Sequence, residues 1–263
     1  GNHDWYDGLT LFLAKFCSGK ETSLGSWKAY QSRSYFAVKL PSNWWIWGLD
    51  TQLGEDIDQP QKKYSIDIPE ENKSNDTAKI ILCSSVPTWL KVDSKDENER
   101  KKFGMGIDHI ATLVIKEYWP SANIYVVLSG DQHHYSRYTA EKSGTEFITA
   151  GGGGAFLHPT HHLKDEIHIN WIRHSQNLHL AKKEGEDVCF PSREKSRKLA
   201  LGNWKFPFVN WSFCVATLGG FYSLAALLMT MWRKDDPGTL YSSDGFSWFL
   251  NITLFNIFKE FFC

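Results

Sequence analysis

From Phe206 to Trp232 the chain carries no charged residue over 27 consecutive positions. A helix needs about 20 predominantly apolar residues to cross the hydrocarbon core of a bilayer. Trp204 and Trp211 near one end, and Trp232 at the other, lie where aromatic residues flank membrane-spanning helices. The length of the stretch and its lack of charge favour a transmembrane helix over 206–232 rather than a buried core helix. A second hydrophobic or truncated transmembrane segment is expected over 245–263.

The charge and cysteine content argue against a nucleic-acid-binding protein and against a disulfide-stabilised one. The net charge of -1 provides no basic field, so we expect no nucleic-acid partner. Basic residues lie on both sides of the predicted helix, with Lys205 before it and Arg233-Lys234 after it, so they do not fix its orientation. Five cysteines without any CxxC spacing argue against a disulfide framework. Reduced thiols predict that the soluble part faces the cytoplasmic side of the membrane.

The residues before the membrane segment alternate between strand and helix patterns. Apolar runs bounded by polar or glycine-rich turns predict strands, and an apolar spacing of three and four residues predicts helices. These patterns predict an α/β or α+β layered domain with functional loops at the carboxyl ends of strands. The expected strands are 35–40, 43–49, 79–83, 124–128 and 146–149, and the expected helices are a buried one at 7–16, one starting at 59–64, and 106–117.

Composition divides the chain into regions. We expect a domain over 1–162, a polar and basic connector over 163–205, and the membrane segments beyond it. The segment 93–102 is charged and is expected to be a solvated loop. Because a motif stands at residue 1 and apolar residues end the chain, we expect the chain to be a fragment of a longer protein.

The first chemical motif is Gly1-Asn2-His3-Asp4. The amide oxygen of Asn2 suits a divalent metal, since hard cations prefer oxygen ligands. His3 can protonate a leaving oxygen, and Asp4 can orient its ring. A four-residue string of this kind is also compatible with an ordinary turn.

The second motif is Gly130-Asp131-Gln132-His133-His134, which directly follows the expected strand 124–128. Asp131 and His133 are two positions apart, so both side chains can point to the same concave edge and present an oxygen and a nitrogen to a metal ion. Paired histidines in a loop are otherwise often solvated.

In this order, the two motifs resemble the calcineurin-like metallophosphoesterase superfamily. Its signature runs Asp-x-His, Gly-Asp, Gly-Asn-His-Asp or Glu, a His near a Pro, and Gly-His-x-His. The likeness covers roughly residues 1–160, and the segments at 44–53, 129–138 and 149–161 are similar to a membrane-associated branch. The resemblance implies a four-layered α/β/β/α sandwich, incomplete at its N-terminus and followed by the transmembrane helix.

The resemblance also implies roles for individual residues. Asn2 corresponds to a ligand of the second metal, His3 to the catalytic histidine near the leaving group, and Asp4 to its orienting partner. Asp131 and His133 correspond to first-metal ligands, although the family has histidine where Asp131 stands. The family's middle histidine falls at Ser85, a poor ligand for which His134 is a candidate substitute.

His158 follows the Gly151–Gly154 turn, together with His161 and His162. These histidines either line the mouth of the site or belong to a polar loop. The tetraglycine itself either lets backbone amides approach a phosphate or serves as a turn.

The implied activity is hydrolysis of phosphate mono- or diesters by a membrane-attached enzyme that uses two divalent ions (Mn, Fe, Zn or Mg). Its substrate would be a phosphorylated small molecule, lipid or nucleotide. The Asp-x-His and Gly-Asp motifs do not precede Asn2 in these 263 residues, so the fragment alone is expected to be nearly inactive. Two alternatives remain: a catalytically impaired, membrane-anchored binding or sensor module of the same fold, and an accessory domain of a multi-span membrane protein.

Overall fold

The computed structural model describes residues 2–17, 23–51, 57–71, 77–92, 107–108, 111–152 and 156–235. The chain forms two compact units, Gly1–Ala200 and Leu201–Cys263, which are considered separately below.

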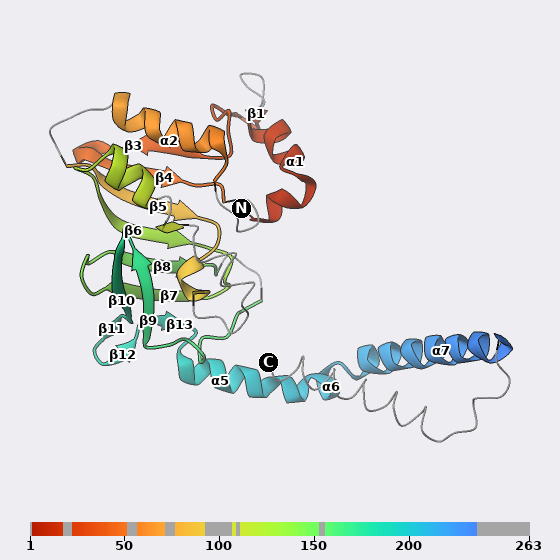
Figure 1. Cartoon of the computed structure of the whole chain (residues 1–263). Helices are drawn as coiled ribbons and strands as arrows, with labels where there is room; N and C mark the ends of the chain where they lie inside the picture. The colour runs from red at the N-terminus through yellow and green to blue at the C-terminus, as the bar shows by residue number, and fades with distance from the viewer. Residues whose placement is uncertain are drawn as a thin grey trace. The chain divides into compact units, whose positions relative to one another are not determined.

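The first unit is a mixed α/β domain built on a nine-stranded sheet (Figure 1). Strand order along the sheet is β3-β4-β5-β6-β8-β7-β10-β9, and β13 pairs with β7. The strands are β3 (Phe36–Lys39), β4 (Trp44–Gly48), β5 (Lys79–Ser84), β6 (Asn123–Ser129), β7 (Tyr135–Ala140), β8 (Glu146–Ala150), β9 (Glu166–Trp171), β10 (His174–Leu180) and β13 (Cys189–Phe190). Two small hairpins lie off the sheet: β1 (Ser23–Leu24) with β2 (Trp27–Lys28), and β11 (Lys182–Lys183) with β12 (Glu186–Asp187).

The centre of the sheet is parallel and its flanks are antiparallel. β4, β5, β6 and β8 run in the same direction. β3 pairs antiparallel with β4, and β7, β10 and β9 complete the sheet as antiparallel strands. The four parallel strands therefore deliver their following loops to one edge, the edge to which their arrowheads point in Figure 1.

Helical segments connect the strands. Before β3 come η1 (Asn2–Asp7), α1 (Thr10–Phe12) and η2 (Leu13–Cys17), and η3 (Pro41–Asn43) precedes β4. α2 (Gln59–Glu71) lies between β4 and β5, and η4 (Thr88–Leu90) and η5 (Ala111–Tyr118) lie between β5 and β6. α2 and η5 contact each other, and Figure 1 shows both on the same side of the sheet.

An aromatic cluster fills the core between the sheet and these helices. Trp47 is 2% exposed, and Trp119 packs edge-on against both Trp45 and Trp47, with ring centroids 5.4 and 6.5 Å apart. Edge-to-face packing of this kind suits the charge distribution of aromatic rings. Trp45 and Trp47 are thus core residues, as their apolar strand predicts.

Most of the predicted elements of the first unit are confirmed. The five predicted strands match β3, β4, β5, β6 and β8 to within one or two residues, and the helix predicted from 59–64 is α2. The 106–117 helix matches the helical residues 107–108 and η5. The charged segment 93–102 lies outside the described residues.

The prediction of a buried helix at 7–16 is wrong in one respect. The segment is helical from Thr10 to Cys17, but Leu11 is 66% exposed, and Leu13 and Phe16 are each 39% exposed. Only Leu9 and Cys17 are buried there. The apolar composition of the segment predicts a core element, but the segment lies at the surface of the unit.

The prediction of a connector over 163–205 is also wrong for most of its length. β9 and β10 extend the main sheet, and the first unit continues to Ala200. In β9 the side chains of Ile167, Ile169 and Trp171 are buried, and the residues between them are exposed. The exposed half of this alternation is made of Glu, His and Asn, which gives the segment its polar composition.

Helix α5 (Arg193–Gly202) is held to the sheet domain by its first turns. The Ser196 hydroxyl is buried and accepts a hydrogen bond of 2.9 Å from the backbone N–H of Thr160, which is also buried. The Arg193 guanidinium forms ion pairs with Asp165 at 2.7 Å and with Asp187 at 3.2 Å. The start of α5 is therefore fixed by contacts distant in sequence.

Replacing Ser196 with alanine is expected to lower the free energy of unfolding by about 1–3 kcal/mol, because the buried N–H of Thr160 loses its acceptor. The melting temperature of the chain in non-ionic detergent micelles, followed by near-UV circular dichroism, measures the change. Ser26→Ala, at an exposed turn, is the matched control and should melt like wild type. Equal melting temperatures for both variants would contradict the structural role of Ser196.

The second unit contains η6 (Asn203–Lys205), α6 (Phe206–Val209) and α7 (Trp211–Asp235). No single helix among the described residues is both long and apolar enough to span a membrane. The helical pair Arg193–Val209 and Trp211–Ala225, bent by 72°, meets the requirement together by length and composition. The predicted segment 206–232 is thus helical but broken at Asn210, and the segment 245–263 lies outside the described residues.

Candidate active site

The loop that follows β6 carries the second motif and is tightly built. Asp131 has a φ of 54°, a left-handed conformation that aspartate tolerates better than most residues. The backbone N–H of Gly151 donates to the His134 carbonyl at 3.1 Å. A Cβ added to Gly151 would lie 1.9 Å from the Gln132 carbonyl oxygen, so only glycine fits against this loop. The loop is therefore positioned by backbone contacts with the end of β8.

His133 is fixed by His158, a residue 25 positions away. The backbone N–H of His133 donates to Nδ1 of His158 at 3.0 Å, and the backbone N–H of His158 donates to the His133 carbonyl at 3.1 Å. The two rings stack with centroids 4.6 Å apart, and Phe156 packs edge-on against both. Since Nδ1 of His158 accepts a hydrogen bond, its ring is held in one orientation.

Two imidazole atoms of this loop are buried without a hydrogen bond. Nδ1 of His133 and Nδ1 of the adjacent His134 have no hydrogen-bond partner among the described residues. A buried polar atom in that state costs free energy unless something else satisfies it. A ligand atom of a metal site has this property when no metal is present, because the metal is its partner.

His134 has a different environment. It is 1% exposed, and its Nε2 lies 3.2 Å from the Ser136 hydroxyl. Burial, with a smaller effect from the neighbouring His162 and His158, lowers its pKa to about 4. Its imidazole is therefore neutral at pH 7 and lies in the interior at the start of β7.

The N-terminal motif reaches the same edge of the sheet at the end of β4. The indole N–H of Trp5 donates to the Asp50 carboxylate at 2.7 Å and so attaches η1 to the residue that follows Leu49. Asp4, Asp50 and Ser85 line one small cavity of about 40 Å3, together with Leu9, Phe12, Ser34 and Leu49. The motif at residue 4 and the position of the family's middle histidine, Ser85, are thus brought together.

The two other members of the first motif are His3 and Asn2. The side chain of His3 is exposed, and its ring lies 5.0 Å from the ring of Tyr6. The side chain of Asn2 lies outside the described residues. The metal-ligand role of Asn2 and the catalytic role of His3 stay predictions.

Ser85 lies between the N-terminal motif and the loop after β6. Its hydroxyl lies 3.4 Å from that of Thr51, which follows β4. A Cβ added to Gly130 would lie 3.8 Å from the Ser85 carbonyl oxygen, so the loop after β6 lies directly beside it. The loops after β4, β5 and β6 are therefore contiguous, with Asp4 at one end of the row and Asp131 at the other.

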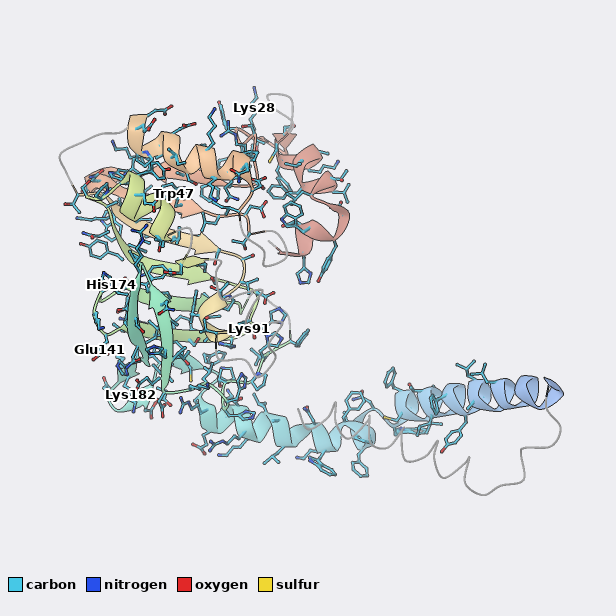
Figure 2. The ribbon with its side chains drawn as sticks, in the orientation of Figure 1. Lys28, Trp47, Lys91, Glu141, His174 and Lys182 are labelled. Carbon is cyan, nitrogen blue, oxygen red and sulfur yellow. The ribbon has the colours of Figure 1, made fainter. Side chains whose placement is uncertain are left out.

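Sequence reasoning missed one basic residue at this edge. Lys91, just after η4, lowers the pKa of both His158 and His162, although burial is the larger cause for each. The aspartate at 131 opposes the effect on His158. Figure 2 shows Lys91 on the side of the sheet to which β5 and β6 point. No local pattern marks this lysine, because its position depends on the fold of the loop after β5.

The donor atoms fit a divalent metal in type but fall short in number. The carboxylate of Asp131 and the imidazole of His133 are suitable ligands. Among the residues that the structure describes, no group of three or more His, Cys, Asp or Glu side chains is arranged to hold a metal ion. A metal at this position therefore needs donors in addition to these two.

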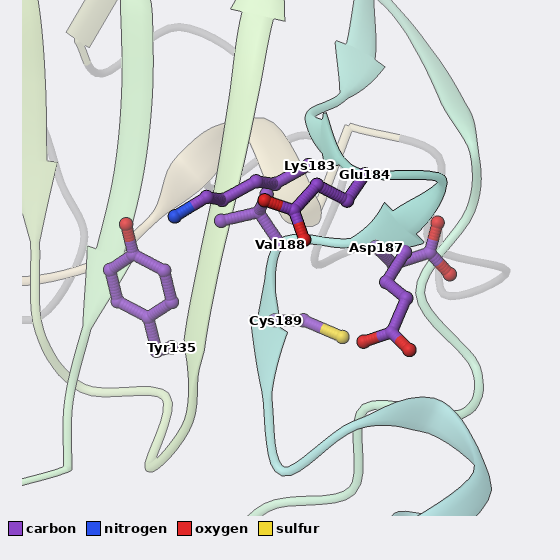
Figure 3. Close-up of a pocket in the computed structure, with 7 residues that line it drawn as sticks. Tyr135, Lys183, Glu184, Asp187, Val188 and Cys189 are labelled. Carbon is purple, nitrogen blue, oxygen red and sulfur yellow. The ribbon is translucent and has the colours of Figure 1, made fainter.

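A cavity away from this edge has the wrong charge for a phosphate ester. It has a volume of about 470 Å3 and lies between β7, β13 and the β11–β12 hairpin (Figure 3). Its lining includes one lysine, Lys183, but three carboxylates, Glu184, Glu186 and Asp187. A surplus of negative charge repels a phosphate dianion, so the edge of the sheet remains the better candidate.

Comparison with known proteins does not identify this site. No protein-family model matches the chain, and no curated protein matches it.

Proposed function

We propose that the chain is part of a membrane-attached, metal-dependent phosphoesterase that hydrolyses phosphate mono- or diesters. The observation that carries the proposal is the buried, unsatisfied Nδ1 of His133 beside Asp131, on a loop at the carboxyl edge of a parallel sheet. Edges of this kind are where α/β proteins place their ligand sites. In the proposal, the complete domain has the four-layered α/β/β/α architecture that the motifs resemble.

The residues at this edge have distinct roles in the proposal. Asp131 and His133 hold one divalent ion, and Asn2 contributes to a second. When bound, the two ions lower the pKa of a water molecule and neutralise phosphoryl oxygens. The ammonium of Lys91 favours an anionic substrate over a neutral one. His3 donates a proton to the leaving oxygen, and Asp4 orients its ring.

Membrane attachment is the second part of the proposal. The broken helical pair that ends in Trp211–Ala225 has the length and composition of a span, and α7 exposes apolar side chains at many positions. We propose that this region is inserted in a bilayer and that the phosphoesterase domain lies on the cytoplasmic side.

The full-length protein tests the proposal directly. We expect manganese-dependent hydrolysis of p-nitrophenyl phosphate esters and one or more tightly bound metal ions per chain, measured by plasma mass spectrometry.

The alternative is a non-catalytic module that keeps the fold and lacks the second metal. Ser85 favours it, because a hydroxyl bonded to Thr51 stands where the resemblance implies a histidine ligand. Fewer than one bound metal per full-length chain, together with no turnover, would support this alternative and overturn the enzymatic proposal.

A further inference from the structure

The segment from Arg193 to Val209 changes from basic to aromatic along its length. Its residues 193–205 include five basic side chains and a single acidic one, Glu194. Toward the C-terminal end of the segment, large apolar side chains are exposed: Leu201 by 67%, Trp204 by 63%, Phe208 by 83% and Val209 by 74%. A basic stretch followed by exposed aromatic residues is the composition of a segment at the boundary between headgroups and acyl chains.

Two of the five basic side chains form ion pairs with carboxylates of the protein. Arg193 is paired with Asp165 and Asp187, and the Lys198 ammonium is paired with Glu194. The ammonium of Lys195 lies 5.8 Å from the ring of Phe190, a contact that leaves its charge uncompensated. Lys195, Arg197 and Lys205 are all exposed. The surface of this segment is therefore cationic.

The break at Asn210 separates this segment from the apolar helix that follows. Asn210 has φ -116° and ψ 41°, outside the helical region, and the two arms are bent by 72°. An angle of this size is close to that between the plane of a membrane and its normal. One arm can thus lie along the surface while the other enters the hydrocarbon core.

We propose that the segment Arg193–Val209 lies in the headgroup region of an anionic membrane, where Lys195, Arg197 and Lys205 bind lipid phosphates and carboxylates. Trp204 and Phe208 enter the boundary with the acyl chains. The proposal rests on the membrane attachment of the proposed function and adds to it a preference for one class of lipid. The occupant follows from charge: a cationic surface next to an apolar one is complementary to negatively charged amphiphiles.

The test uses the full chain, made by cell-free synthesis in the presence of vesicles and recovered by flotation. The vesicles contain either phosphatidylcholine alone or phosphatidylcholine with 30% phosphatidylserine. At 20 mM salt, half of the chain should float at a roughly tenfold to hundredfold lower lipid concentration with the anionic vesicles. Raising the salt to 500 mM should remove most of that difference, because headgroup attraction is screened.

Two variants with the same change in charge separate the segment from the rest of the protein. Lys195→Gln/Arg197→Gln/Lys205→Gln should lose the preference for anionic vesicles. Lys15→Gln/Lys28→Gln/Lys63→Gln, which changes three exposed lysines of the sheet domain, should keep it. The salt dependence of the wild-type chain tests the proposal even if the first variant does not fold.

The outcomes distinguish a preference for anionic lipid from membrane attachment itself. Equal flotation of the wild-type chain with both vesicle types at low salt would overturn the lipid preference and leave membrane attachment intact. No flotation with either vesicle type would overturn both. Equal loss of preference in the two variants would show that net charge, and not this segment, is responsible, and would also overturn the inference.

Discussion

Replacing His133 with alanine in the full-length protein is expected to reduce the manganese-dependent hydrolysis of p-nitrophenyl phosphate by roughly 10²–10³-fold. The buried Nδ1 of His133 has no hydrogen-bond partner among the described residues, as expected for a metal-ligand atom, and unlike that of His134 it belongs to a side chain paired with Asp131 in the motif. Loss of one ligand weakens the metal that stabilises charge in the transition state, and each tenfold loss in rate corresponds to about 1.4 kcal/mol. The content of bound metal, measured on the same samples, should fall together with kcat.

The matched control is His174→Ala, on an exposed position of β10 labelled in Figure 2. It should keep wild-type turnover and metal content. Because His133 also stacks on His158, the melting temperature of each variant has to be recorded. A His133→Ala protein that melts like wild type and keeps its metal and its rate would remove the main support for the proposed site.

Replacing Gly151 with alanine is expected to destabilise the first unit by about 3 kcal/mol or more and to abolish metal binding. The new Cβ would lie 1.9 Å from the carbonyl oxygen of Gln132 and 2.6 Å from its carbonyl carbon. Both are backbone atoms of the loop that carries Asp131 and His133, so the clash is relieved only by moving that loop. A fall in melting temperature of roughly 6–12 °C corresponds to this destabilisation in a domain of this size.

Gly152→Ala is the control for Gly151→Ala. A Cβ on Gly152 would meet no heavy atom within 4 Å. Gly152→Ala should therefore change the free energy of unfolding by no more than about 0.5 kcal/mol, as expected for a surface position. If the two variants melted at the same temperature, the tight contact between the end of β8 and the loop after β6 would be refuted.

The strands that could be predicted from the sequence share one property. β5 and β6 are central and parallel, and their apolar runs end at polar turns, so each can be read from its own residues. β9 was missed because only one of its faces is buried, and its polar half dominates the composition of the segment. β7 was missed for a similar reason, since its half-buried tyrosine, arginine and threonine alternate with buried positions, the first of which is a serine. β9 forms by pairing with β10, and β7 forms by pairing with β8. No local sequence pattern shows either pairing.

The residues of the candidate site also divide into those that local sequence predicts and those that only the fold brings together. Asp131 and His133 could be predicted because a turn after a strong strand places them at a sheet edge. The contacts that hold them could not be predicted, since His158 and Gly151 reach the loop only through the fold. Lys91 and Asp50 also join the edge through long-range packing. The sequence motifs thus identify the candidate ligand residues, whereas the tertiary structure determines how these residues are held.

The hydrogen bond between Trp5 and Asp50 joins η1 to the end of β4, and Asn2, His3 and Asp4 all belong to this short helix. The three residues therefore depend together on the contacts of η1, whereas Asp131 and His133 are held by a different loop. A change at position 5 or 50 would weaken the attachment of half of the proposed site without altering any group proposed to bind metal or transfer a proton.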